Sequence, residues 1–138
     1  MKKNGFTLIE ILIAVILIGV AVVGLVASSI SFTESNGFGT DFSTAEFLVQ
    51  QIRELTAMTD YSDLFNYDGV SYNPPRGTNN EVLNDFSEFT QVVTVENVSD
   101  FDFETIVTDY SSNFIRVTAR VFLNSRELCS ASWIRAQE

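Results

Sequence analysis

The sequence predicts an α+β protein in which one long N-terminal helix packs on a small antiparallel β-sheet. Three patterns lead to this prediction: an apolar run over residues 6–30, a stripe of apolar residues at helical spacing that continues to about Met58, and strand-like alternation over residues 90–135. The first half of the helix is long enough to span a membrane. The second half is amphipathic, so we expect only this half to cover the sheet.

The apolar run is unbroken from residue 11 to residue 27. About 20 predominantly apolar residues are enough to cross a bilayer as a helix. A secretory signal peptide would have a shorter apolar core of roughly 7–15 residues and a clear small-residue cleavage site. A cytosolic core helix would need protein around all its faces. We therefore predict a transmembrane helix over residues 6–30.

Charges at the start of the chain predict the orientation of this helix. Lys2 and Lys3 precede it, and no further Lys or Arg occurs before Arg53. The positive-inside rule then leaves the N-terminus in the cytoplasm and residues 31–138 on the other side. Glu10 is the exception in this segment, since a charged residue at the middle of a spanning helix costs about 2.5–3.5 kcal/mol. Such a residue is expected to have a function and a partner.

The first residues also resemble a known family. The sequence Gly5-Phe6-Thr7-Leu8-Ile9-Glu10, after a basic leader and before a long apolar run, resembles the class III leader of type IV prepilins and of type II secretion pseudopilins. The resemblance implies that a prepilin peptidase cuts between Gly5 and Phe6 and methylates the new amino terminus of Phe6. Residues 1–5 would then be a cleaved leader, and Glu10 would be the fifth residue of the mature chain.

The resemblance also implies an assembly. Residues 6–30 would form the transmembrane and polymerisation helix, and residues 31–138 a periplasmic or extracellular head. The implied partners are other pilin or pseudopilin subunits, the prepilin peptidase and an assembly platform of the bacterial inner membrane. In the filament, Glu10 of one subunit would meet the methylated amine of Phe6 on a neighbour. The subunit would end in a cell-surface pilus or a periplasmic pseudopilus.

Weaker similarities favour a minor subunit. The segments 45–51, 72–75 and 132–134 resemble minor pilins and minor pseudopilins more than major pilins. Many major pilins close their C-terminal region with a disulfide, and a chain whose single cysteine is Cys129 cannot form one. We therefore predict a minor pilin of a type IV pilus or a minor pseudopilin of a type II secretion system, with the choice between the two left open.

Composition limits the other functions. Two of the eight basic residues, Lys2 and Lys3, lie in the leader, so its removal leaves six arginines against eighteen acidic residues and a formal side-chain balance of −12. Nucleic acid is therefore an unsuitable partner. Without His, and with one Cys, the chain cannot build a His-based triad or a Cys/His zinc site. We predict a non-enzymatic protein with no catalytic residue, metal or cofactor. The alternative is a non-polymerising single-span protein with an extracytoplasmic binding domain.

Past the membrane segment, the spacing predicts that the helix continues with one apolar face. Asn36-Gly37-Phe38-Gly39 is its weak point, because each Gly costs about 1 kcal/mol relative to Ala. A second helix capped by Ser43-x-x-Glu46 is the alternative to the continuous helix that we predict. Within the membrane half, Gly19 and Gly24 favour close helix packing over local melting. The stripe expected to pack on the sheet consists of Phe38, Phe42, Ala45, Val49 and Ile52, with Leu48 and Leu55 beside it.

After an irregular polar stretch over residues 60–85, the chain predicts about three antiparallel strands. These cover residues 90–98, 115–123 and 127–135, and the last two are joined by a turn at residues 124–126. We expect Cys129 to be a small buried residue and Trp133 to belong to the core.

One acidic cluster raises the question of a metal site. Asp100, Asp102 and Glu104 alternate with phenylalanines, so on a strand they would share one face. A solvated acidic face is the preferred interpretation. The alternative, a calcium site, would need six to eight oxygen ligands in a closed shell.

Overall fold

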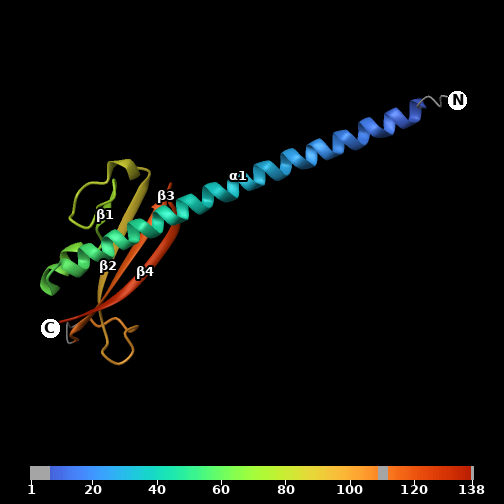
Figure 1. Cartoon of the computed structure of the whole chain (residues 1–138). Helices are drawn as coiled ribbons and strands as arrows, with labels where there is room; N and C mark the ends of the chain where they lie inside the picture. Colours follow the sequence, from blue (N-terminus) through green and yellow to red (C-terminus); the bar gives the residue numbers. More distant parts are fainter. Residues whose placement is uncertain (1–6, 109–111, 138) are drawn as a thin grey trace. The chain divides into compact units, whose positions relative to one another are not determined.

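The computed structural model describes residues 7–108 and 112–137, and it confirms an α+β fold with a long N-terminal helix on an antiparallel sheet (Figure 1). The chain divides into two compact units, one ending at Thr40 and the other beginning at Asp41. The second unit contains the sheet and makes up most of the predicted head. The elements are α1 (Leu8–Met58), η1 (Tyr61–Tyr67), β1 (Ser71–Tyr72), η2 (Asn84–Phe86), β2 (Phe89–Val98), β3 (Phe114–Leu123) and β4 (Arg126–Ala136).

The prediction of a continuous helix is confirmed. α1 passes through the glycine-containing segment 36–39 without a break, and no new helix starts at Ser43. Polar side chains on either side of the glycines bond back to the helix itself. The hydroxyl of Thr33 donates to the carbonyl of Ser29, and that of Thr40 donates to the carbonyl of Asn36. These groups therefore need no partner outside the helix.

The predicted stripe packs on the sheet over only part of its length. Phe38 is 52% exposed and Phe42 is 38% exposed, so the expectation that both cover the sheet is wrong. Periodicity shows which face of a helix is apolar, but it does not show how much of that face another element covers. In the head, the buried residues of α1 are Ala45, Leu48, Val49, Ile52, Leu55 and Thr56.

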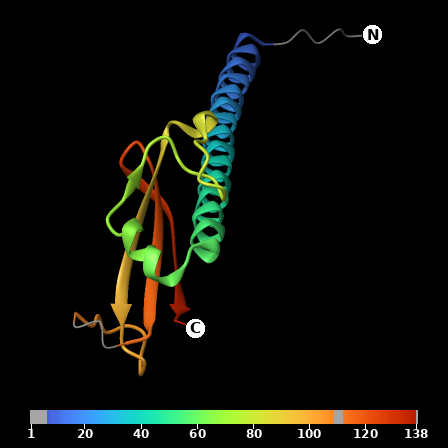
Figure 2. The same ribbon diagram turned by 90° about the vertical axis from the view of Figure 1, so that its left-hand side faces the viewer.

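The sheet has the order β1-β2-β3-β4, and every neighbouring pair is antiparallel. Figure 2 shows the three long strands in the head beside the second half of α1. These three strands match the predicted ones to within a residue or two. The two-residue strand β1 was not predicted, because it is too short to show alternation. The inner residues of the two central strands are Phe89, Gln91, Val93 and Val95 from β2 and Ile115, Val117, Ala119 and Val121 from β3.

The β3–β4 hairpin turns where the sequence predicts. Asn124 and Ser125 lie between paired residues Leu123 and Arg126, and both have positive φ, 48° and 68°. Two consecutive residues with positive φ are typical of a type I′ turn, whose twist matches that of the strands. This turn sets the first pairs of the hairpin, Leu123 with Arg126 and Phe122 with Glu127, and an irregularity between Val121 and Phe122 then shifts the register of the rest of β4.

A buried glutamine on β2 bonds both to α1 and to the irregular segment that connects α1 to the sheet. Gln91 on β2 is 0% exposed. Its side-chain oxygen accepts from the backbone N–H of Arg76 at 2.7 Å, and its amide donates to the carbonyls of Leu48 at 2.9 Å and Arg76 at 3.1 Å. A second contact holds the same connection, since the Thr78 hydroxyl donates to Oε1 of Gln51 at 2.8 Å. The irregular segment is thus fixed on α1 by polar contacts.

The acidic cluster does not lie on a strand. Asp100, Asp102 and Glu104 follow the end of β2 in an irregular loop, which contradicts the prediction of one acidic strand face. The reason is local: the Asp102 carboxylate accepts bonds from the backbone N–H groups of Glu104 and Thr105 and from the Thr105 hydroxyl at 2.6 Å. Such side-chain-to-backbone bonds form a turn in place of extended structure. They also hold the pKa of Asp102 below its usual range, with the Thr105 hydroxyl as the largest cause.

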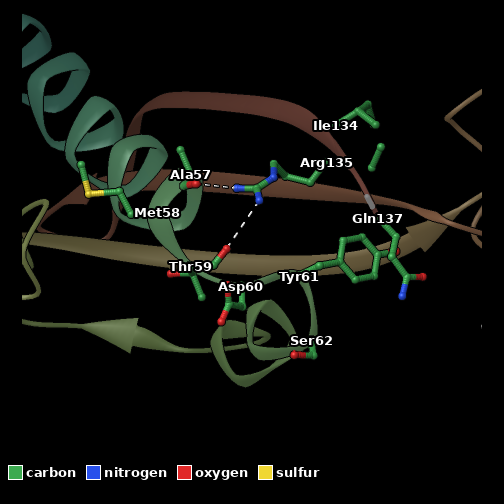
Figure 3. Close-up of a pocket in the computed structure, with 10 residues that line it drawn as sticks. Ala57, Met58, Thr59, Asp60, Tyr61, Ser62, Ile134, Arg135 and Gln137 are labelled. Carbon is green, nitrogen blue, oxygen red and sulfur yellow. Dashed lines mark hydrogen bonds between the residues drawn. The ribbon is translucent and has the colours of Figure 1, made fainter.

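The end of α1 is capped from the other end of the chain. The last turn of α1 contains no basic residue. Nη1 of Arg135 on β4 donates to the carbonyls of Thr56 at 2.6 Å and Ala57 at 3.0 Å, and Nη2 donates to that of Thr59 at 3.5 Å. Figure 3 shows the bonds to Ala57 and Thr59. A cation at a helix C-terminus satisfies the last carbonyls and offsets their partial negative charge. Arg135 therefore fixes the place where α1 ends in the head.

Candidate functional site

The start of α1 is capped by the residue just before it. The carbonyl of Thr7 accepts from the backbone N–H groups of Glu10 at 3.1 Å and Ile11 at 3.3 Å. The Thr7 side-chain oxygen also accepts from the N–H of Glu10, at 3.4 Å. Thr7 is thus the N-cap residue, and Thr7-x-x-Glu10 has the spacing of a capping box. The sequence carried this signal, although it was not among the caps considered above.

Glu10 lies in the first turn of α1 and is exposed. A carboxylate is favourable there because the N-terminus of a helix carries partial positive charge. Within the described residues, no basic group lies within ion-pair distance of the Glu10 carboxylate. The partner expected for Glu10 is therefore not provided by this part of the chain.

No other element of the described chain covers the apolar first half of α1. Leu8 is 86% exposed, Leu17 is 64% exposed and Leu25 is 74% exposed. α1 is the helix, among the residues described, that is long and apolar enough to cross a membrane, and its most apolar window is 0% buried. An apolar surface of this size marks a membrane or protein interaction site.

Gly19 and Gly24 lie within this uncovered surface. A Cβ atom at either position would meet nothing within 4 Å. No close approach within the described part of the chain therefore requires a glycine there, and α1 remains helical through both. Their expected role in close packing between helices stays a prediction.

The residues predicted for processing, Gly5 and Phe6, lie outside the described residues. The structure does place the two residues that follow them: Thr7 caps the helix, and Leu8 begins it. The regular helix therefore starts two residues after the predicted new N-terminus.

Three features together define a class of protein: the exposed apolar surface, the Glu10 carboxylate in the first turn of α1, and the folded α+β head. Proteins of this class have an apolar N-terminal anchor helix that continues as the first helix of a small head. Residues 1–26 match the protein family described as the prokaryotic N-terminal methylation motif. This match bears out the resemblance of the first residues to a class III prepilin leader, and it supports a type IV pilin-like protein. This leader and the apolar helix together indicate membrane anchoring. No curated protein and no solved structure matches the chain.

The head contributes two further residues that the sequence singled out. Cys129 packs against the core but is only partly buried. Burial, followed by the nearby Glu46 charge, raises the pKa of its thiol, so the thiol is poorly reactive at neutral pH. Trp133 also packs against the core from β4. In the part of the chain that the structure describes, no group of three or more Cys, Asp or Glu residues could hold a metal ion.

Proposed function

We propose that the chain is a structural subunit, either a minor pilin of a type IV pilus or a minor pseudopilin of a type II secretion system. The observation that carries the proposal is the direct junction of the methylation motif with a helix whose apolar surface nothing in the described chain covers. The subunit would assemble with other pilin or pseudopilin subunits and need no chemistry of its own. A prepilin peptidase and an inner-membrane assembly platform would act on it.

The membrane stage follows from the distribution of charge and apolar residues. Residues 1–5 would remain in the cytoplasm until cleavage, residues 6–30 would cross the inner membrane, and residues 31–138 would form the head in the periplasm. Burying one Leu, Ile or Val side chain stabilises by roughly 1.5–3 kcal/mol. Since α1 exposes many of these side chains, the helix should stay in lipid or in contact with neighbouring helices at every stage.

Glu10 would set the register of assembly. After cleavage, the methylated amine of Phe6 would lie next to the start of α1, where partial positive charge from the helix disfavours a second positive group. A carboxylate from a neighbouring subunit would relieve this repulsion. Pairing would also offset the cost of keeping either charge out of water. A subunit in the wrong register would leave both charges unpaired.

The minor assignment rests on weaker support. Cys129 is the one cysteine in the sequence, so the disulfide that closes the C-terminal region of many major pilins cannot form. We expect a low-copy component that helps to start or cap assembly. Quantitative proteomics of purified filaments should find this subunit well below the major subunit, and near-equal abundance would contradict the minor assignment alone.

An intact-mass spectrum of the mature protein tests the processing step. The expected mass corresponds to a chain that starts at N-methylated Phe6, and a bulky residue in place of Gly5 should leave the leader attached. A mature protein that keeps residues 1–5 would instead support the non-polymerising single-span alternative.

Sheared filaments test the role of Glu10. Glu10→Val should insert into the membrane at least as well as the parent, because it removes a charge from the span, but its incorporation into filaments should fall. Glu34→Val is the matched control, since Glu34 is an exposed residue further along the same helix. Equal incorporation of both variants would show that the Glu10 carboxylate does not set the register.

A further inference from the structure

A loop that follows β2 exposes apolar side chains at the surface of the head. The loop covers residues 99–107, and Figure 2 shows it in orange beyond the end of β2. Among the described residues, Phe101 has the largest exposed fraction of any large apolar side chain, 96%, compared with 86% for Leu8 in the apolar half of α1. Phe103 and Ile106 of the same loop are also exposed. Several exposed apolar side chains in one short segment indicate an interaction site.

Hydrogen bonds hold the backbone of this loop on both sides of Phe101. The N–H of Phe101 donates to the side-chain oxygen of Ser99 at 3.2 Å, and the N–H of Phe103 donates to the carbonyl of Ser99 at 3.0 Å. The N–H of Ser99 donates to the carbonyl of Thr105 at 2.9 Å. The Phe103 ring packs edge-on against Phe114 of β3, with 5.1 Å between the ring centroids. A side chain on such a bonded loop loses less conformational entropy when it binds.

The charges next to Phe101 in the sequence are all negative. No Lys or Arg occurs between residues 76 and 116, and Arg116 pairs with Glu96 at 2.7 Å. A surface of this sign repels anionic lipid headgroups and nucleic acid, and it attracts Lys and Arg side chains. The charge therefore favours a basic protein surface as the partner of the loop. Its acidic residues, all exposed, are Asp100, Asp102 and Glu104.

We propose that this loop docks on a partner protein by placing Phe101 in an apolar pocket whose rim carries Lys or Arg side chains. Phe101 supplies the buried contact, and Asp100 and Glu104 face the basic rim. Asp102 bonds within the loop, so its role is to shape the loop. A central aromatic side chain inside a polar rim is the usual arrangement of a protein interface. The proposal goes beyond the filament assignment and does not depend on it.

Photo-crosslinking of the full chain, in the cells that express it naturally, tests this contact. The photoreactive residue p-benzoylphenylalanine replaces Phe101, whose exposure leaves room for the larger side chain. Mass spectrometry of the digested adduct then identifies the residues to which position 101 is joined. The same replacement at Met58, another exposed position in the head, is the matched control. We expect adducts from position 101 alone, in one partner protein, at an apolar pocket bordered by Lys or Arg.

Charge variants test the basic rim. Asp100→Asn combined with Glu104→Gln should lower the adduct yield from position 101 by roughly fivefold, because it removes two charges that face the rim. Asp85→Asn combined with Glu88→Gln is the control, since it removes the same two charges from exposed positions just before β2.

Four results would overturn the proposal. Equal yields from positions 101 and 58 would show that Phe101 makes no special contact. Adducts on lipid would show that the loop faces a membrane, and adducts on a second copy of the chain would show self-association. A yield that both pairs of charge variants leave unchanged would show that the partner has no basic rim.

Discussion

The two halves of α1 have the same backbone structure but differ in what covers their side chains. In the first half, every large aliphatic side chain from Leu8 to Ile30 is at least 50% exposed. In the second half, Ala45, Leu48 and Ile52 are 0% exposed, because the sheet covers them. The second half is therefore stabilised by the head of the same chain. The first half has no such cover within the described chain, and under the proposed function lipid or other subunits would stabilise it.

This difference shows that helical structure and burial are separate properties. An apolar sequence free of proline forms a helix whether or not its own chain packs on it, since the backbone bonds are satisfied within the helix. Burial requires a second surface. For the first half of α1, the proposed function supplies this second surface: lipid while the subunit is in the membrane, and neighbouring subunits once it is in the filament.

The largest expected effect is at the center of the covered face. Ile52→Asp should unfold the head, because burying a charge in a small core costs several kcal/mol, a large part of a typical stability of about 5–15 kcal/mol. Circular dichroism melts of a chain that starts near Ser31 measure this. Phe38→Asp, an exposed position on the same helix, should leave the melt nearly unchanged. An Ile52→Asp protein as stable as the parent would mean that this face does not need the sheet.

Gln91→Leu probes the polar contacts that hold the connecting segment to the covered half. The leucine has a similar size but leaves the backbone N–H and C=O of Arg76 without their partner, which should cost about 2–4 kcal/mol. Gln50→Leu is the control, since Gln50 is exposed and bonds only the side chain of Glu54, as far as the described contacts go. Denaturant unfolding of both variants gives the difference. Equal stabilities would show that the Gln91 contacts contribute little.

Arg135→Met tests how α1 ends. Removing the guanidinium leaves the carbonyls of Thr56, Ala57 and Thr59 without this donor, so the head should lose about 1–2 kcal/mol. Arg53→Met, at an exposed position of the same helix, should change stability by less than about 0.5 kcal/mol. Hydrogen exchange should show faster opening of the last turn of α1 in Arg135→Met alone. Unchanged exchange would contradict the capping role.

The smallest expected effect concerns Asp102, which lies after β2 and away from the covered face of α1. The pKa of Asp102 is lower in the folded protein than in the unfolded chain. The ionised carboxylate therefore stabilises the fold at pH values above the unfolded pKa. This stabilisation is lost as the pH falls through the folded pKa, below about pH 4. Thr105→Val should move the pKa of Asp102 back toward its ordinary value. Carboxyl-carbon NMR titration measures the shift, with Thr108→Val as the control. A titration unchanged by Thr105→Val would show that the hydroxyl is not the main cause.

The sequence alone predicted the elements whose signal is local and repeated. The membrane-length run, the amphipathic spacing around Ile52 and the alternation over β2 and β3 each extend over ten or more residues, so one irregular residue does not hide them. The leader motif lies in one contiguous stretch of sequence, so it could be recognised without a structure.

Only the tertiary structure decided the features that depend on distant segments meeting. Phe38 and Ile52 belong to one periodic stripe, but Phe38 is 52% exposed whereas Ile52 is fully buried in the core of the head. Arg135 caps a helix that ends almost eighty residues earlier, and Gln91 is buried because its partners come from α1 and from the connection. Short elements such as β1 and the turn at Asp102 have too few residues for a period. Their conformation follows from individual hydrogen bonds, which periodicity does not encode.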